Sequence, residues 1–323
     1  YIGNIAIKED KIAYIGNNKN LKGEKTINAR GKAISPGFIN MLSWGYNSLL
    51  KDGRSLSDLK QGVTLEVFGE GMSWGPLNEE MKVDLLKKQG DIQYEIPWNT
   101  LGEYLQFLED KGVSTNVASF IGATTLRINA VGYEDREPNP KELKLMTDLV
   151  HQGMKEGALG IGSSLIYAPA FYSSTKELIE ICKVAAQYDG MYISHMRSEG
   201  NKILESVDEL MTIAKEAGIR SEIYHLKQSG KKNWGKLDAV IQKIDSARTA
   251  GLYITTDMYN YTAGATGLDA SMPPWVQEGG LDKWIERLKK PSIKKRVIKE
   301  MQNCGSILGG EQSGHIILSE FSK

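Results

Sequence analysis

The chain has 323 residues, with 40 basic and 40 acidic side chains that give a formal net charge of zero. This balance argues against nucleic acid or an anionic membrane as the main partner, because both favour a basic surface. No apolar run approaches the ~18–20 residues of a transmembrane span, and Cys182 and Cys304 form neither a CxxC site nor a disulfide framework. We expect a soluble protein with a small-molecule substrate; the sequence indicates neither its oligomeric state nor its compartment, cytoplasmic or periplasmic.

The first 34 residues differ from the rest of the chain. The stretch NIAIKEDKIAYIG alternates apolar and polar residues in two short runs joined by the charged turn Glu9-Asp10-Lys11, which predicts a β-hairpin. We expect residues 1–34 to be part of a small β-subdomain. The sequence starts at Tyr1 without a methionine and ends in HIILSEFSK without a helix cap, so we expect a segment of a longer protein, truncated at its N-terminus.

From residue 35 onward, short apolar runs alternate with helical patterns, several of which end in a glycine at the place of a helix C-cap. Such β-then-α units predict a parallel sheet, because parallel neighbours need a crossover connection. The seven predicted strands span residues 37–42, 64–70, 116–122, 158–165, 191–196, 221–226 and 252–259.

Two α/β architectures contain such units, the closed (β/α) barrel and the open doubly wound sheet. The unit count, one short of eight, and the absence of a GxGxxG dinucleotide fingerprint both favour the barrel. We therefore predict that residues 35–323 form a TIM-like (β/α)8 barrel that is incomplete at its C-terminal end. Its eighth strand is expected beyond Lys323.

Two of the four histidines end consecutive predicted strands. His195 closes MYISHM and His225 closes SEIYHL, 30 residues later, which is about one βαβ unit. Side chains at the carboxyl ends of neighbouring parallel strands, about 4.8 Å apart, can converge on one metal ion. A single buried histidine is more often structural, but two at matching strand ends favour a shared metal. His151, in a helical pattern, and His315 are expected to be ordinary core or surface residues.

Several blocks around these histidines resemble one enzyme family. HMRSEG, the HLK…NWGK block and QGVTLEVFGEG are similar to the D-aminoacylase (N-acyl-D-amino-acid deacylase) family of the amidohydrolase superfamily, and the similarity extends over essentially the whole chain. The resemblance implies a metal-dependent (β/α)8 barrel with a small β-sandwich subdomain, to which residues 1–34 would contribute. It also implies hydrolysis of the amide bond in N-acyl-D-amino acids.

The resemblance also implies a set of metal ligands. His195 and His225 match the fifth- and sixth-strand ligands of the tightly held zinc. The third family ligand is a cysteine in a GNCG turn after the second strand; the turn here is GEG, so we expect Glu70 to replace it. A carboxylate is a competent zinc ligand, although a solvated loop glutamate is the alternative. Glu66, four residues earlier, lies deeper in the strand and is the weaker candidate.

Further residues match substrate-contacting positions of the family. Lys227, Tyr167 and Tyr259 are expected to bind the substrate, the lysine through the substrate carboxylate. Arg197 and Glu199, in HMRSE, are expected to brace His195, since metal-bound histidines normally have such partners. The alternatives are a solvated charge for Lys227 and rim packing for the two tyrosines. For Arg197 and Glu199 the alternative is a surface ion pair.

The chain also departs from the family pattern. Leu42 and Trp44 stand in place of the first-strand HxH pair, and Ala123 stands where relatives often have histidine. We therefore expect a single Zn ion. The general-base aspartate is expected beyond Lys323, so no catalytic residue is assigned within the chain. The predicted function is a mononuclear zinc amidohydrolase; the alternatives are a non-catalytic small-molecule-binding relative, and a cyclic amidase or deaminase on the same barrel.

Overall fold

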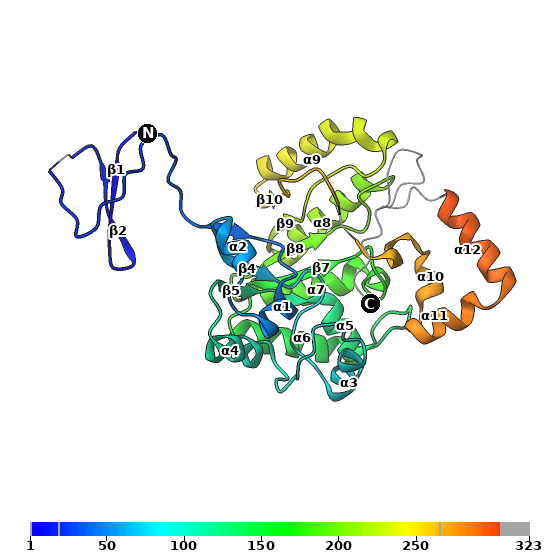
Figure 1. Cartoon of the computed structure of the whole chain (residues 1–323). Helices are drawn as coiled ribbons and strands as arrows, with labels where there is room; N and C mark the ends of the chain where they lie inside the picture. Colours follow the sequence, from blue (N-terminus) through cyan, green and yellow to red (C-terminus); the bar gives the residue numbers. More distant parts are fainter. Residues whose placement is uncertain (1, 19, 265, 304–323) are drawn as a thin grey trace. The chain divides into compact units, whose positions relative to one another are not determined.

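The computed structural model describes residues 2–18, 20–264 and 266–303 (Figure 1). The chain divides into two compact units, Tyr1–Gly37 and Phe38–Lys323. None of the helices within the described ranges has both the length and the apolar character needed to cross a lipid bilayer.

The first unit contains one antiparallel hairpin. Strand β1 (Asn4–Lys8) pairs with β2 (Lys11–Gly16), and Glu9 in the connecting turn has a φ of 57°. The predicted hairpin is confirmed. Ile7, Ile12 and Ile15 remain exposed. Within the described part of this unit, these three side chains are therefore not packed into an apolar core. Its place in a small β-sandwich stays a prediction.

The second unit is an α/β structure built on parallel strands. All seven predicted strands are present, and the third of them is divided in two at Phe120. The strands are β3 (Phe38–Asn40), β4 (Val63–Phe68), β5 (Asn116–Ser119), β6 (Ile121–Gly122), β7 (Gly160–Ser164), β8 (Met191–His195), β9 (Arg220–Ile223) and β10 (Ile254–Thr256).

The strands pair strictly in chain order. One parallel sheet has the order β3-β4-β5 and the other has the order β10-β9-β8-β7-β6. Residues 116–122 belong to both sheets, and the backbone N–H of Phe120 donates to Phe68 O at 2.9 Å. A doubly wound sheet reverses its strand order at a switch point, and no such reversal occurs among the described strands. Pairing between β3 and β10 is likewise not found in the described chain.

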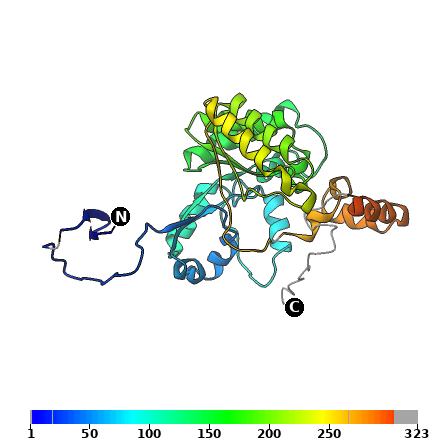
Figure 2. The same cartoon turned by 90° about the horizontal axis from the view of Figure 1, so that it is seen from above.

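The helices lie outside the strands, and α6 to α9 form a row of neighbours (Figure 2). Asn139 caps α6 by accepting from the backbone N–H groups of Lys141 and Glu142, which stabilises such a helix by ~1 kcal/mol. The helices are α1 (Tyr46–Lys51), α2 (Leu56–Lys60), α3 (Glu79–Lys87), α4 (Leu101–Lys111), α5 (Ala123–Ala130), α6 (Pro140–Lys155), α7 (Thr175–Ala186), α8 (Ile203–Ala217), α9 (Leu237–Thr249), α10 (Pro274–Gln277), α11 (Leu281–Leu288) and α12 (Pro291–Asn303). Three short 3-10 helices are η1 (Ala170–Tyr172), η2 (Lys231–Lys236) and η3 (Leu268–Ser271).

A second, smaller apolar cluster lies apart from the main core. It consists of Val67, Phe120, Ile193 and Tyr224, and Leu42 packs against it. These residues come from β4, from the β5–β6 junction, from β8 and from just after β9. Strands contribute to such a shared cluster when a sheet curves around its own interior. The ends of β4, β8 and β9 meet next to this cluster, and the polar residues described next follow from those ends.

Candidate metal centre

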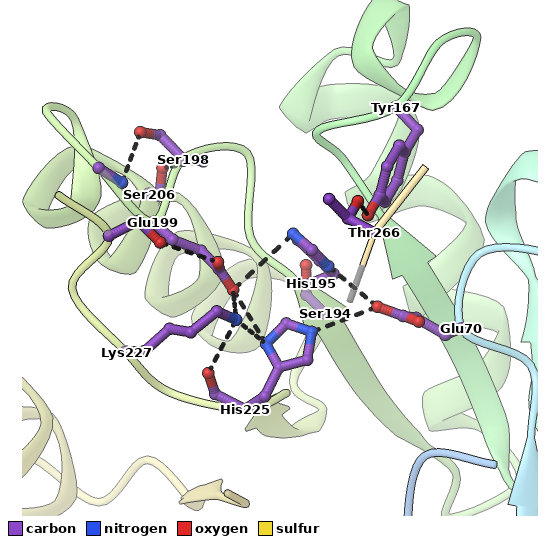
Figure 3. Close-up of polar contacts among 12 residues, drawn as sticks. Glu70, Tyr167, Ser194, His195, Ser198, Glu199, Ser206, His225, Lys227 and Thr266 are labelled. Carbon is purple, nitrogen blue, oxygen red and sulfur yellow. Dashed lines mark hydrogen bonds and ion pairs between the residues drawn. The ribbon is translucent and has the colours of Figure 1, made fainter. Parts of the chain in front are cut away.

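Glu70, His195 and His225 converge on one point although they come from three different strands (Figure 3). His195 is the last residue of β8, while Glu70 and His225 each follow the end of their strand by two residues. The Oε1 atom of Glu70 lies 2.9 Å from Nδ1 of His195 and 3.4 Å from Nε2 of His225. All three side chains are buried. The structure therefore brings together the two histidines and the glutamate that were expected to meet.

The backbone around Glu70 explains why this side chain can reach the histidines. Gly69 and Gly71, on either side of Glu70, have φ angles of 105° and 73°, which L side chains rarely adopt. A Cβ atom at Gly69 would also lie 2.5 Å from Phe120 O. The GEG turn thus needs glycine on both sides to lift Glu70 out of strand register. Glu66, inside the strand, instead accepts from the hydroxyl groups of Ser43 and Thr115.

The distances from Glu70 to the two histidines fit a divalent cation. Two ligands of a tetrahedral zinc, each about 2.1 Å from the ion, lie about 3.4 Å apart. The observed separations of 2.9 and 3.4 Å from Glu70 Oε1 are close to this value. Two imidazoles and one carboxylate are also a donor set that zinc accepts in catalytic sites. The group can hold such an ion through Nδ1 of His195, Nε2 of His225 and Oε1 of Glu70.

Without a cation, these groups stabilise one another's charges. Burial raises the pKa of the Glu70 carboxyl, but hydrogen bonds with His195 and His225 outweigh burial and set the pKa at about 2. Burial lowers the pKa of His225, but hydrogen bonds with Glu199 and Glu70 outweigh it and raise the pKa to about 9. A proton on His225 thus takes the place of a cation between two carboxylates.

Glu199 connects three of the polar side chains of the site (Figure 3). Its Oε1 atom lies 2.9 Å from Nδ1 of His225, 2.7 Å from Nζ of Lys227 and 3.8 Å from Nε2 of His195. Burial raises the pKa of Glu199, but the hydrogen bond with His225 and the nearby positive charges bring it below its ordinary value. Glu199 is thus placed to fix the orientation of His225 first, and that of His195 only at longer range.

Arg197 was expected to brace His195, but its guanidinium is directed elsewhere. It forms an ion pair of 2.8 Å with Glu209 and donates to the backbone oxygens of Phe171 and Ser173. The expected contact with His195 is not among the contacts of the described residues. The guanidinium instead ties the loop after β8 to α8 and to the segment around η1.

The three predicted substrate-binding residues surround the histidines. The ring of Tyr167 packs edge-on against His195 with centroids 5.4 Å apart, and its hydroxyl lies 2.6 Å from the hydroxyl of Thr266. The ring of Tyr259 lies 6.5 Å from that of His225, and Nζ of Lys227 lies 5.7 Å from the Tyr259 centroid. Their place beside the histidines agrees with the positions predicted for them; substrate binding stays a prediction.

Asp257 holds the backbone at His225. Its Oδ1 atom accepts from the His225 backbone N–H at 2.5 Å, and His225 has a φ of 36°, in the left-handed region. A residue with this backbone conformation persists only where its surroundings enforce it. This role of Asp257 is visible only in the structure, because a side chain's contact with a backbone amide leaves no trace in a residue pattern.

Comparison with known proteins gives the relatives of the chain. No protein-family model matches it. D-aminoacylase of Alcaligenes xylosoxydans xylosoxydans is 29% identical over 319 residues, which are 94% of this chain and 65% of that protein. A crystal structure of D-aminoacylase, described as defining a novel subset of amidohydrolases, superposes with a TM-score of 0.72 at 31% identity, over 82% of this chain and 56% of that chain.

The chain is a homologue of the D-aminoacylases. This confirms the resemblance found in the sequence.

Two further solved structures that resemble this chain concern the metal. One is a D-aminoacylase structure on the functional role of the binuclear metal centre, described by one-metal activation and second-metal attenuation; it has 30% identity and a TM-score of 0.71 over 80% of this chain and 55% of that chain. N-acyl-D-glutamate deacylase from Bordetella bronchiseptica, solved with zinc and a phosphonate inhibitor, has 26% identity and a TM-score of 0.70 over 80% of this chain and 54% of that chain. The chain thus spans between 54% and 65% of the length of these relatives.

This chain has other side chains where the resemblance leads us to expect histidines. Leu42 packs against the smaller apolar cluster, and Ala123 is a buried residue that begins α5. Trp44 donates its indole N–H to Oε2 of Glu70 at 3.0 Å. This last contact was not predicted. His151 lies in α6 and forms a hydrogen bond with the hydroxyl of Tyr188, which follows α7. His315 lies outside the described residues, and the eighth strand and its aspartate stay predictions.

Proposed function

We propose that the protein containing this chain is a metal-dependent amidohydrolase that hydrolyses the linear amide of an N-acyl amino acid. The convergence of Glu70, His195 and His225 at one buried point is the observation that carries this proposal. The deacylase homologues support the substrate class. Because those homologues act on D-amino-acid derivatives by name, we propose the D enantiomer as the preferred substrate.

The proposed scaffold is a closed (β/α)8 barrel with a small β-sandwich. Strict chain-order pairing of the strands and the apolar cluster around Phe120 both support closure. An eighth strand beyond Lys323 would complete the cylinder, and residues 1–34 would belong to the β-sandwich. In such barrels the active site lies at the carboxyl ends of the strands, which is where Glu70, His195 and His225 lie.

We propose one zinc ion, held by Glu70, His195 and His225. When bound, zinc lowers the pKa of a coordinated water and polarises a carbonyl oxygen. A single ion is supported by the replacement of the HxH positions with Leu42 and Trp44, neither of which offers a ligand atom. The D-aminoacylase whose binuclear centre is described by one-metal activation indicates that one ion can be sufficient for activity in a relative.

The remaining polar side chains of the site are proposed to hold the substrate and the ligands. An ammonium group has three donors; Lys227 Nζ donates to Glu199 Oε1 at 2.7 Å and to the His225 backbone oxygen at 3.4 Å, so one N–H is left for a substrate carboxylate. The hydroxyls of Tyr167 and Tyr259 would fix the orientation of the acyl group or the carboxylate. Glu199 keeps Lys227 and His225 in place, and an aspartate beyond Lys323 is the proposed general base.

The proposal is tested by metal content and by a substrate panel. Purified protein is expected to contain about one zinc per chain, and the complete protein is expected to hydrolyse N-acetyl-D-amino acids in a chelator-sensitive reaction. The panel includes the L enantiomers and cyclic ureides as controls. Zinc-free protein that still binds N-acyl amino acids without turnover would favour the non-catalytic alternative. Turnover of the cyclic ureides alone would favour the cyclic amidase.

Zinc loading is expected to release protons at neutral pH. The pKa of His225 is about 9 in the metal-free protein, so this imidazole is protonated at pH 7 and must lose its proton to bind zinc. Glu70, with a pKa of about 2, is already ionised and contributes no proton. Zinc affinity should therefore rise with pH up to about 9. Calorimetry at pH 7 in buffers of different ionisation enthalpy should show the release, and an enthalpy independent of the buffer would contradict it.

A further inference from the structure

The two oxygens of the Glu70 carboxylate have different partners. Oε1 faces the histidines, at 2.9 Å from His195 and 3.4 Å from His225. Oε2 accepts the indole N–H of Trp44 at 3.0 Å. One face of the carboxylate thus points into the candidate metal centre, while the other is tied to the loop that follows β3.

Trp44 is held in place by other aromatic rings. Its ring lies 5.6 Å from that of Tyr46, which in turn packs edge-on against Phe68 and Trp74, both at 6.0 Å. Phe68 and Trp74 are buried in the main core. The ring of Tyr46 therefore supports the indole from the core, although 54% of Trp44 is exposed. An N–H group on such a support can fix the orientation of its acceptor.

We propose that Trp44 is a positioning residue that restricts Glu70 to one metal-binding oxygen and limits the centre to a single cation. The proposal rests on the proposed function. An indole has a donor and no lone pair for a metal, so Trp44 cannot be a ligand. A carboxylate that bridges two cations with one oxygen on each needs both oxygens, and Trp44 occupies the second one. Leu42, packed against the smaller apolar cluster, offers no ligand atom either.

The experiment compares two tryptophan-to-phenylalanine variants. Trp44→Phe removes the indole donor and keeps an aromatic ring. Trp275→Phe is the matched control, because Trp275 also donates its indole N–H to a carboxylate, Glu300 Oε2 at 2.6 Å, away from the centre. Both proteins are made metal-free, checked by circular dichroism and thermal melting, and titrated with zinc in competition with a chromophoric chelator. Trp44→Leu is the second variant if the phenylalanine protein does not fold.

The wild-type chain is expected to bind one zinc, and Trp44→Phe to bind it about 10–100-fold more weakly, as is typical when a hydrogen-bond partner of a metal ligand is lost. The visible absorption of the cobalt(II)-loaded variant is also expected to change, because a freed Oε2 allows Glu70 to bind through both oxygens. Trp275→Phe should match the wild type in both measurements.

The possible failures are distinguishable. If wild-type protein binds no zinc, the proposed function fails. If wild-type protein binds zinc and Trp44→Phe equals it in affinity and in cobalt spectrum, only the role of Trp44 is overturned. Equal weakening in Trp275→Phe would also overturn that role, because the loss would then be general. A second zinc in the wild-type chain would contradict the limit to one cation.

Discussion

Replacement of His195 by alanine is expected to reduce the zinc content from about one ion per chain to nearly none. The imidazole contributes Nδ1, 2.9 Å from Glu70 Oε1, to the candidate centre, and two ligands remain without it. Loss of the metal removes several kcal/mol of transition-state stabilisation, so hydrolysis by the complete protein should fall on the order of 10³-fold or more. Metal analysis and initial rates measure the two effects.

The control for this variant is another histidine-to-alanine replacement. His151 lies in α6, where Nδ1 is 3.0 Å from the hydroxyl of Tyr188. His151→Ala should therefore keep its zinc and its rate. Full zinc content in His195→Ala would contradict the assignment of the metal centre. Lost zinc with an unchanged rate would instead contradict the role of the metal in catalysis.

Replacement of Arg127 by alanine is expected to destabilise the fold by about 3–5 kcal/mol. Its guanidinium is completely buried and forms a 2.6 Å ion pair with Glu177, and it also donates to the backbone oxygens of Glu134 and Arg136. Alanine would leave the Glu177 carboxylate and two carbonyl groups without their buried partner. Urea denaturation followed by circular dichroism measures the change in the free energy of unfolding.

Two further variants separate the buried ion pair from charge in general. Lys144→Ala breaks the exposed pair with Asp148, and exposed pairs contribute at most about 1 kcal/mol. The double replacement Arg127→Met/Glu177→Leu removes both buried charges, so it should recover part of the stability lost in Arg127→Ala. An Arg127→Ala protein as stable as Lys144→Ala would show that the buried pair contributes little.

The strands of the second unit were predictable because each is a short apolar run between turn residues. Once the strands were placed, the meeting of His195 and His225 followed from the geometry of parallel neighbours. Glu70 was predictable by its position in the GEG turn, while the φ angles of Gly69 and Gly71 that make the position work are visible only in the structure.

Contacts that depend on the direction of a side chain were not predictable. Arg197 is only two residues from His195, yet it turns toward Glu209, because residues after a strand end have no fixed periodicity. The hydrogen bond from Trp44 to Glu70 joins residues 26 positions apart, and the indole that donates it packs against the ring of Tyr46 at a tilted angle. The break of the third strand at Phe120 reflects a change of pairing partner, which an apolar run does not reveal.

Pairing of the strands in chain order has a consequence for biosynthesis. Each strand can join the growing sheet as it leaves the ribosome, since its neighbour has already been made. The candidate ligands do not share this advantage, because Glu70 precedes His195 by 125 residues. At about 5–20 residues per second, Glu70 is synthesised roughly 6–25 s before His195, the first histidine of the candidate centre. Metal capture therefore cannot begin until β8 and β9 have been synthesised, well after the strand that precedes Glu70.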